Sequence, residues 1–208
     1  MGYLGRGETL SLIFLTLMQK SNYREISSYL PSFHVLSEAQ KHLLIEEINW
    51  RQDEIKLFGK THPVPRKHAW YADPDASYSY SGIELPINPW TEQLLELKEK
   101  VETVCEQRFN GVLLNLYSSG SHSNGWHSDD ERELIRPITV ASLSYGQERD
   151  FQLRRKDSSR IDERVLLEDG SLFIMRPPFQ EQWQHKIAKT KKKIGERVNL
   201  TFRLVDSN

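Results

Sequence analysis

Two histidines and one aspartate have the residue types and the order of a mononuclear metal site. His127 and Asp129 are separated by one residue, and His185 follows much later in the chain. If residues 126–130 are extended, the first two side chains point to the same side of a strand and can reach one ion. Two imidazoles and one carboxylate on one face of Fe(II) leave three coordination positions open, as a non-haem oxygenase requires. The pattern predicts an enzyme, although an exposed histidine and a core histidine would match the same letters.

A strand with a charged face is expected near the end of the chain. In a strand over residues 197–203 one face carries Arg197, Asn199, Thr201 and Arg203, and the residues between them are apolar. A guanidinium group is a planar fork of donors that matches a carboxylate, and a buried arginine without such a partner is costly. A dicarboxylate such as 2-oxoglutarate would satisfy both arginines.

Two more polar residues share one face of a strand at residues 112–117. Asn115 and Tyr117 can both hydrogen-bond a carboxylate. Tyr117 also fits a core position with its hydroxyl group at the surface. The third metal ligand, His185, follows a stretch at residues 171–178 that has the pattern of a strand and a turn, so the chain can return to the same ion.

These residues lie within longer stretches that resemble the AlkB family of Fe(II)- and 2-oxoglutarate-dependent dioxygenases, and within it the eukaryotic-type DNA-repair homologues. The resemblance extends from about residue 57 to residue 204, which is most of the chain. The matching stretches are residues 58–60, 64–67, 78–82, 115–117, 127–133, 149–151 and 197–203.

The resemblance implies a set of cofactor ligands. Iron would be bound by His127, Asp129 and His185, and 2-oxoglutarate by Asn115, Tyr117, Arg197, Thr201 and Arg203. Arg197 and Tyr117 are expected at the distal carboxylate, with Arg203 and Asn115 nearer the metal-chelating end. O₂ would be the second co-substrate.

The resemblance also implies residues that contact a flipped base. They are Leu57, Phe58, Arg66, Tyr78, Tyr80, Asp130 and Glu131. Leu57 and Phe58 match an apolar wedge that enters the duplex, with Gly59 in a tight turn behind it. Tyr80 and the ring of His127 would enclose the base. A carboxylate beside the slot favours a methylated base because that base is positively charged. Phe58 would also fit as an ordinary buried hairpin residue, and Arg66 as a generic phosphate contact or a solvated arginine. Asp130 and Glu131 would also fit a solvated acidic turn.

The implied activity is direct-reversal repair. Bases such as 1-methyladenine and 3-methylcytosine in single- or double-stranded DNA would be demethylated by hydroxylation, with release of formaldehyde and succinate. The same chemistry on RNA, on tRNA or on a protein side chain is the alternative within this class. A catalytically silent jelly-roll module that binds nucleic acid is the alternative from another class. We expect a monomer with no membrane association.

Composition limits the other possibilities. The chain has 208 residues and a formal net charge of −1, so any nucleic-acid surface must be local. The single cysteine, Cys105, excludes an internal disulfide and fits a reducing compartment, the cytoplasm or the nucleus. The apolar run at residues 10–18 is far shorter than the roughly 20 residues that span a bilayer.

The order of the expected elements indicates the fold class. Ser37 and Gln40 form a capping box before a helix whose apolar positions are Ala39, Leu43, Leu44 and Ile48. Thr91 caps a second helix with an apolar stripe of Leu94, Leu97, Val101, Val104 and Cys105. Short strands follow after about residue 109, including residues 137–145, 151–155 and 165–167.

Helices followed by many short strands predict an α+β domain with a double-stranded β-helix (jelly-roll) core and the helices outside its sheet. We expect one domain over residues 1–208. Its parts are a helical region at residues 1–56, a nucleotide-recognition lid at residues 57–90 and a catalytic core at residues 109–205.

Overall fold

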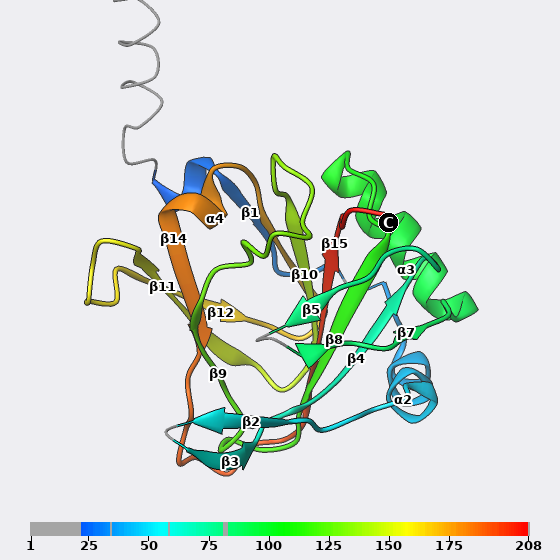
Figure 1. Cartoon of the computed structure of the whole chain (residues 1–208), viewed down its shortest axis with the longest axis horizontal. Coiled ribbons are helices and arrows are strands. Elements are labelled where there is room, and N and C mark those ends of the chain that lie inside the picture. Colours follow the sequence, from blue (N-terminus) through cyan, green and yellow to red (C-terminus); the bar gives the residue numbers. More distant parts are fainter. Residues whose placement is uncertain (1–21, 34, 58, 81–82, 208) are drawn as a thin grey trace, which may run out of the picture.

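Two β-sheets face each other, with two short hairpins beside them (Figure 1). The computed structural model describes residues 22–33, 35–57, 59–80 and 83–207.

The major sheet has the order β1 (Ser27–Leu30), β13 (Ser171–Met175), β10 (Val140–Gly146), β15 (Arg197–Arg203), β8 (Gly111–Tyr117), β4 (Lys67–Ala72) and β7 (Ile87–Asn88). The minor sheet has the order β12 (Glu163–Leu167), β11 (Arg149–Arg155), β14 (Trp183–Ile187) and β9 (Asn124–His127). The hairpins are β2 (Glu54–Leu57) with β3 (Lys60–Pro63), and β5 (Ser79–Tyr80) with β6 (Ile83–Glu84).

The predicted jelly-roll fold is confirmed. The strands of both sheets pair antiparallel, except that β4 pairs with β7 in parallel. One core cluster fills the space between the sheets and includes Phe151, Phe173 and Trp183. A second cluster lies on the outer face of the major sheet, where Leu114, Leu143 and other strand residues meet the helices.

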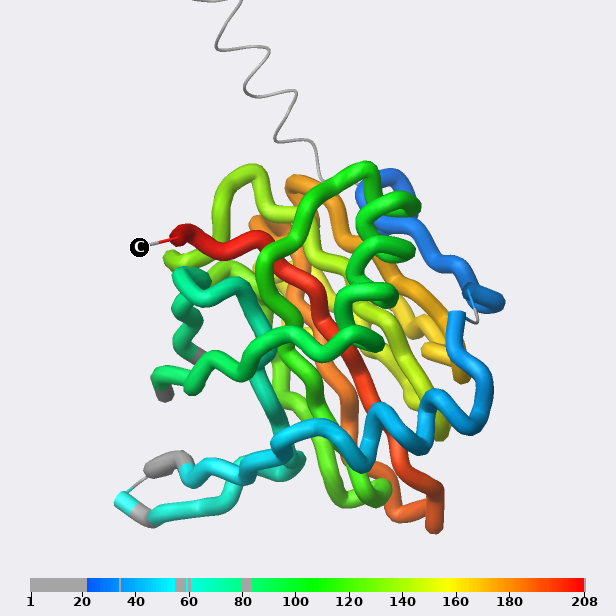
Figure 2. Tube along the Cα trace, turned by 90° about the vertical axis from the view of Figure 1, so that its right-hand side faces the viewer, coloured from blue at the N-terminus to red at the C-terminus, as the bar shows by residue number. Residues whose placement is uncertain are grey.

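Both expected helices are present, and they cover the outer face of the major sheet (Figure 2). They are α2 (Glu38–Glu47) and α3 (Glu92–Cys105). The side chain of Ser37 accepts from the Gln40 backbone and Gln40 contacts Ser37 in return, so the capping box is confirmed. Thr91 accepts from the backbone of Leu94 at 3.2 Å. The local cap signals therefore identified both helix starts correctly.

The apolar stripes were only partly right. Leu44 and Ile48 are buried, but Ala39 and Leu43 are exposed, and on α3 Val104 is exposed as well. On α2 the chain buries Lys41 instead, because its ammonium group pairs with Glu38 and Asp169, each at 2.6 Å. A polar residue can thus occupy a core-facing helix position when a neighbouring loop supplies its counter-charge.

The expected N-terminal helical region has mixed structure where it is described. Tyr23–Glu25 form the 3-10 helix η1, and β1 then pairs with β13 at the edge of the major sheet. A further short helix, α4 (Phe179–Gln182), precedes β14. The apolar run at residues 10–18 lies outside the described residues. Within the described residues, no helix combines the length and the apolar character that a membrane crossing requires.

Candidate metal centre and anion pocket

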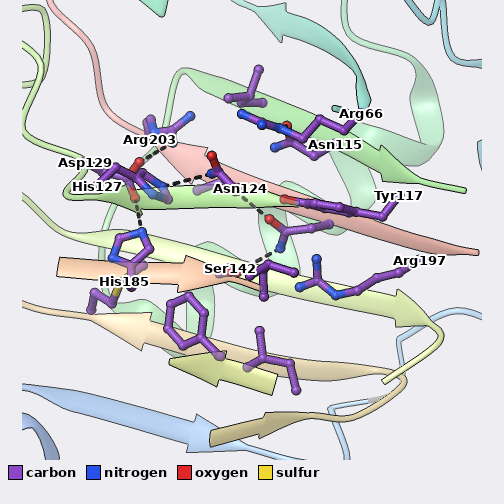
Figure 3. A pocket seen from close by; sticks show the side chains of 17 residues that line it. Arg66, Asn115, Tyr117, Asn124, His127, Asp129, Ser142, His185, Arg197 and Arg203 are labelled. Carbon is purple, nitrogen blue, oxygen red and sulfur yellow. Dashed lines mark hydrogen bonds and ion pairs between the residues drawn. The ribbon is translucent and has the colours of Figure 1, made fainter. Parts of the chain in front are cut away.

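The three residues expected to bind a metal lie together between the two sheets (Figure 3). His127 ends β9 and is the register partner of His185 in β14. One ligand atom from each histidine and one from Asp129 all lie within 4.8 Å of one another. The expected extended stretch over residues 126–130 is wrong in detail, because β9 ends at His127 and Asp129 lies in a bend. There the backbone N–H of Asp129 donates to Gln180 Oε1 at 2.9 Å, which holds the bend.

The charges of this cluster suit a metal. Asp129 accepts from Arg203 Nη2 at 2.5 Å, and its other oxygen is 3.5 Å from His185 Nε2. Burial opposes the charged carboxylate, but Arg203 and then His185 hold the pKa of Asp129 well below its usual value. Burial and the nearby His127 lower the pKa of His185 to about 3, and burial also lowers the pKa of His127. At neutral pH the cluster therefore offers a carboxylate and two neutral imidazoles, the forms that bind a metal.

A polar wall extends from the metal cluster along β8 and β15. These strands pair over their whole length, and Arg197 is the register partner of Tyr117. Arg197 Nη2 donates to Ser144 Oγ at 2.9 Å, and its guanidinium carbon lies 5.2 Å from the centre of the Tyr117 ring. Asn199 donates to Ser142 Oγ at 2.8 Å and accepts from Thr201 at 3.0 Å. The residues thus form one hydrogen-bonded surface on the inner face of the sheet.

The wall has unused donors and an excess of positive charge. Among the described residues, Nε and Nη1 of both Arg197 and Arg203 are buried without a hydrogen-bond partner. Burial lowers the pKa of Arg197 to about 10. Arg66 is a third buried cation lining the same pocket, whereas Asp129 is the one carboxylate among its lining residues. Buried N–H groups that have no hydrogen-bond partner destabilise the folded state. A small dianion would satisfy them, so the residues present fit both Fe(II) and 2-oxoglutarate.

A family model described as "2OG-Fe(II) oxygenase superfamily" matches residues 26–203. The chain therefore belongs to this superfamily. A solved structure described as "The structure of OsALKBH1" covers 88% of the oxygenase with a TM-score of 0.60 at 18% identity, which supports the fold alone.

Among curated proteins, the oxygenase resembles two groups of AlkB homologues. It is 43% identical over 158 residues to "DNA oxidative demethylase ALKBH2" of Bos taurus, a match that covers 73% of the oxygenase and 57% of the relative. It is 37% identical over 186 residues to "Alpha-ketoglutarate-dependent dioxygenase alkB homolog 3" of Bos taurus, covering 84% and 64% respectively. The oxygenase thus spans less than two thirds of the length of these relatives. The resemblance to the AlkB family found in the sequence is confirmed.

Among the residues expected at the substrate base, Tyr78 connects to the metal pocket. Its ring stacks on Trp70 with centroids 4.7 Å apart, and its hydroxyl donates to Glu131 Oε1 at 2.8 Å. The guanidinium carbon of Arg203 lies 5.1 Å from the centre of the Tyr78 ring. Burial raises the pKa of Glu131. Two of the residues expected at the base, Tyr78 and Glu131, therefore lie in one cluster with Arg203.

The other expected substrate residues have different positions. The side chain of Asp130 is 47% exposed and pairs with Lys156 at 2.7 Å, so it faces the surface and not Glu131. Phe58 lies outside the described residues, whereas Leu57 ends β2 and Tyr80 belongs to β5. Gly59 has a positive φ of 76°, so the expected tight turn is present. The roles of Leu57, Phe58 and Tyr80 stay predictions.

Arg66 is expected in the nucleotide lid, but its side chain is buried and lines the anion pocket (Figure 3). Its Nε donates to Asn115 Oδ1 at 2.7 Å, and its Nη1 donates to the Ser123 carbonyl at 3.2 Å. Arg66 therefore supports the cofactor side of the site. Arg66 immediately precedes β4, and the pairing of β4 with β8 brings it to Asn115.

Several residues of the pocket were not predicted from the sequence. Ser142 and Ser144 support Asn199 and Arg197, and Asn124 contacts His127 Nε2 at 3.1 Å. The two serines alternate with apolar residues in β10, and this polar alternation in a buried strand was an available signal.

Proposed function

We propose that this oxygenase removes methyl groups from N-alkylated bases in nucleic acid, with DNA as the first substrate, by Fe(II)- and 2-oxoglutarate-dependent hydroxylation. The observation that carries the proposal is the cluster of the half-buried His127 with the buried Asp129 and His185, beside two arginines that have buried N–H groups without a hydrogen-bond partner. The names of the relatives, DNA oxidative demethylase ALKBH2 among them, favour an alkylated base as the substrate.

One group of pocket residues would bind the metal, and another would bind the dicarboxylate. His127, Asp129 and His185 would hold Fe(II), and Arg197 with Tyr117 would hold the distal carboxylate of 2-oxoglutarate. When bound, the metal and 2-oxoglutarate supply, with O₂, the oxidising power for hydroxylation of a methyl group, and 2-oxoglutarate becomes succinate and CO₂. Arg203 orients Asp129 through the 2.5 Å hydrogen bond and so fixes one ligand of the cluster.

The substrate base would be held by Tyr78, Tyr80 and Glu131. A base methylated at N1 of adenine or N3 of cytosine is a cation, and a buried carboxylate beside it is more favourable than beside a neutral base. The hydroxymethyl product is unstable on nitrogen, so it loses formaldehyde and the original base is restored. Because the methylated edge lies inside a duplex, the base must leave the stack, and a lesion that pairs poorly is cheaper to extrude.

The test is an anaerobically Fe(II)-loaded turnover assay with 2-oxoglutarate and DNA carrying 1-methyladenine or 3-methylcytosine. We expect formaldehyde and restored base, both dependent on iron and on 2-oxoglutarate. Asp129→Asn should abolish both, whereas Asp150→Asn is the matched control because Asp150 lies on the surface and pairs with Arg164. Consumption of 2-oxoglutarate without repair of DNA would contradict the substrate assignment but leave the iron site in place.

The same assay separates the alternatives. Methylated RNA and a methylated peptide are included at equal concentration, and faster turnover of either would replace DNA as the substrate. Phe58→Ala should reduce repair of duplex DNA more than repair of single-stranded DNA. Only in a duplex does the extruded base leave a space in the stack that an apolar side chain would fill. Equal losses on both substrates would count against the wedge.

A further inference from the structure

The outer face of the minor sheet carries two cations on one indole ring. The guanidinium carbon of Arg154 lies 4.3 Å from the centre of the Trp126 ring, and the ammonium nitrogen of Lys186 lies 4.6 Å from it. Gln184 Oε1 accepts from both Nε and Nη2 of Arg154, at 3.0 and 2.7 Å. The three side chains come from β9, β11 and β14, so the strands hold this cluster rigidly.

Strand alternation places Trp126 on that face. His185 pairs with His127 and Ile187 with Asn124, so Lys186 is opposite Gly125 and Trp126 of β9. Neighbouring residues of a strand point to opposite faces of the sheet. Trp126 therefore lies on the outer side, next to Lys186, whereas the adjacent His127 faces the metal cluster. Only the thickness of β9 separates the indole from the pocket.

The two cations lack a counter-charge. The neighbouring cations are paired, Arg164 with Asp150 and Lys156 with Asp130. Over the parts of the chain that the structure describes, neither Arg154 nor Lys186 forms an ion pair. Two like charges on one ring repel each other, and the π face offsets that repulsion only in part. An anion at this place would complete the cluster.

We propose that the Trp126, Arg154 and Lys186 cluster binds the phosphodiester backbone of the strand that carries the target base. This deepens the proposed function and rests on it. An extruded base stays covalently attached to its sugar and phosphate, so the backbone must pass the outside of the pocket. The planar fork of Arg154 matches phosphate oxygens in a bidentate way, and Trp126 acts as a positioning residue for both cations.

The test measures the affinity of labelled oligonucleotides for the metal-free full chain by fluorescence anisotropy over a range of salt concentrations. Arg154→Gln and Lys186→Gln should each weaken binding about three- to tenfold, equally for damaged and undamaged strands. Each should also lower the slope of log affinity against log salt by about 0.7 to 0.9. Lys100→Gln is the matched control, because it removes one exposed charge from α3 on the other side of the molecule.

Trp126 is tested with the charges left intact. Trp126→Leu should weaken binding, and Trp126→Phe should restore most of it because a π face is kept. In a double-mutant cycle, Trp126→Leu and Arg154→Gln together should weaken binding less than the two single losses predict. Thermal midpoints confirm that each variant is folded, and the phenylalanine variant keeps the test valid if the leucine variant does not fold.

Three other outcomes of these binding experiments would contradict the inference, and they differ in what they imply for the proposed function. If the wild-type chain binds oligonucleotides while Arg154→Gln and Lys186→Gln behave like Lys100→Gln, the inference is overturned and the proposed function stands. If the wild-type chain binds no oligonucleotide, both are overturned. If a polyglutamate peptide of equal charge binds this face and the oligonucleotide slopes are unchanged, the face serves an acidic protein and not a nucleic acid.

Discussion

The inner wall of β8 and β15 and the two hairpins β2–β3 and β5–β6 are held in very different ways. Every residue of β8 and β15 is buried, and β15 is hydrogen-bonded on both sides, to β10 and to β8. Among the residues that the structure describes, each hairpin pairs with itself alone, and β5 pairs with β6 at two positions. The residues proposed to bind a metal and an anion therefore lie on or beside long paired strands, whereas Leu57 and Tyr80, two of the residues expected at the base, lie on short hairpins.

With the proposed roles, residues of the sheet would serve the reaction itself and residues of the hairpins the choice of substrate. Register fixes Arg197 opposite Tyr117 for every substrate, because the whole sheet would have to slip to move either. The hairpin β2–β3 instead depends on a small anchor at its base, where Asp53 accepts from Arg51 at 2.5 Å and contacts His68 Nε2 at 2.9 Å. Changes in the wall should abolish turnover, and changes near the hairpins should alter the choice of substrate.

The largest effect is expected from Asp129→Ala in the metal cluster beside the wall. It removes a metal ligand, so turnover and Co(II) binding, followed by absorbance, should both be lost. It also leaves the buried Arg203 without its partner, so the free energy of unfolding in urea should fall by about 3–5 kcal/mol. Asp129→Asn keeps an acceptor and should destabilise the protein less. Retention of Co(II) binding by the alanine variant would contradict the ligand assignment.

A smaller effect is expected from Arg197→Lys. The lysine keeps the charge but loses the planar fork, so the dissociation constant for 2-oxoglutarate should rise about ten- to a hundredfold. Calorimetry with Mn(II)-loaded protein measures this without turnover. Arg164→Lys on the outer face of the minor sheet is the control, and it should bind as the wild type does. An unchanged constant for Arg197→Lys would place the carboxylate elsewhere.

The proposed base contact is tested by comparing two adjacent acids. Glu131 lies with Tyr78 and Arg203, whereas Asp130 pairs with Lys156 at the surface. Glu131→Gln should lower kcat/KM for 1-methyladenine DNA about tenfold, from loss of a charged contact of roughly 1.4 kcal/mol. Asp130→Asn should change it less than about twofold, as for other surface ion pairs. The reverse order would show that Asp130 turns toward the base when substrate binds.

The smallest effect concerns the hairpin anchor and pH. Burial lowers the pKa of His68, despite the opposing effect of Asp53, so the folded state disfavours its protonation. Its contribution to stability is therefore present above the unfolded pKa of about 6.5 and is lost as the pH falls below it. The unfolding free energy of the wild type minus that of His68→Gln should fall by roughly 1 kcal/mol between pH 7 and pH 5.

Much of the fold could be predicted from local signals. The cap residues Ser37 and Thr91 marked the starts of both helices. A cap is a local signal, because its side chain accepts from a backbone N–H in the first turn of the same helix. The alternation in residues 197–203 assigned the two faces of β15, since side chains alternate along any strand. The exposed Leu43 and the buried Lys41 were not predictable, because only the position of Asp169, far along the chain, decides which helix face is covered.

The sequence by itself determined which residues are able to bind a metal and a dicarboxylate, because the chemical groups of a side chain decide what it can bind. Only the tertiary structure decided which of them meet. The bend after β9 brings Asp129 to Arg203, the pairing of β4 with β8 brings Arg66 to Asn115, and the pairing of β9 with β14 brings Trp126 to Lys186. These contacts join segments far apart in the chain, and the choice of which strands pair, which no local pattern encodes, brings them together.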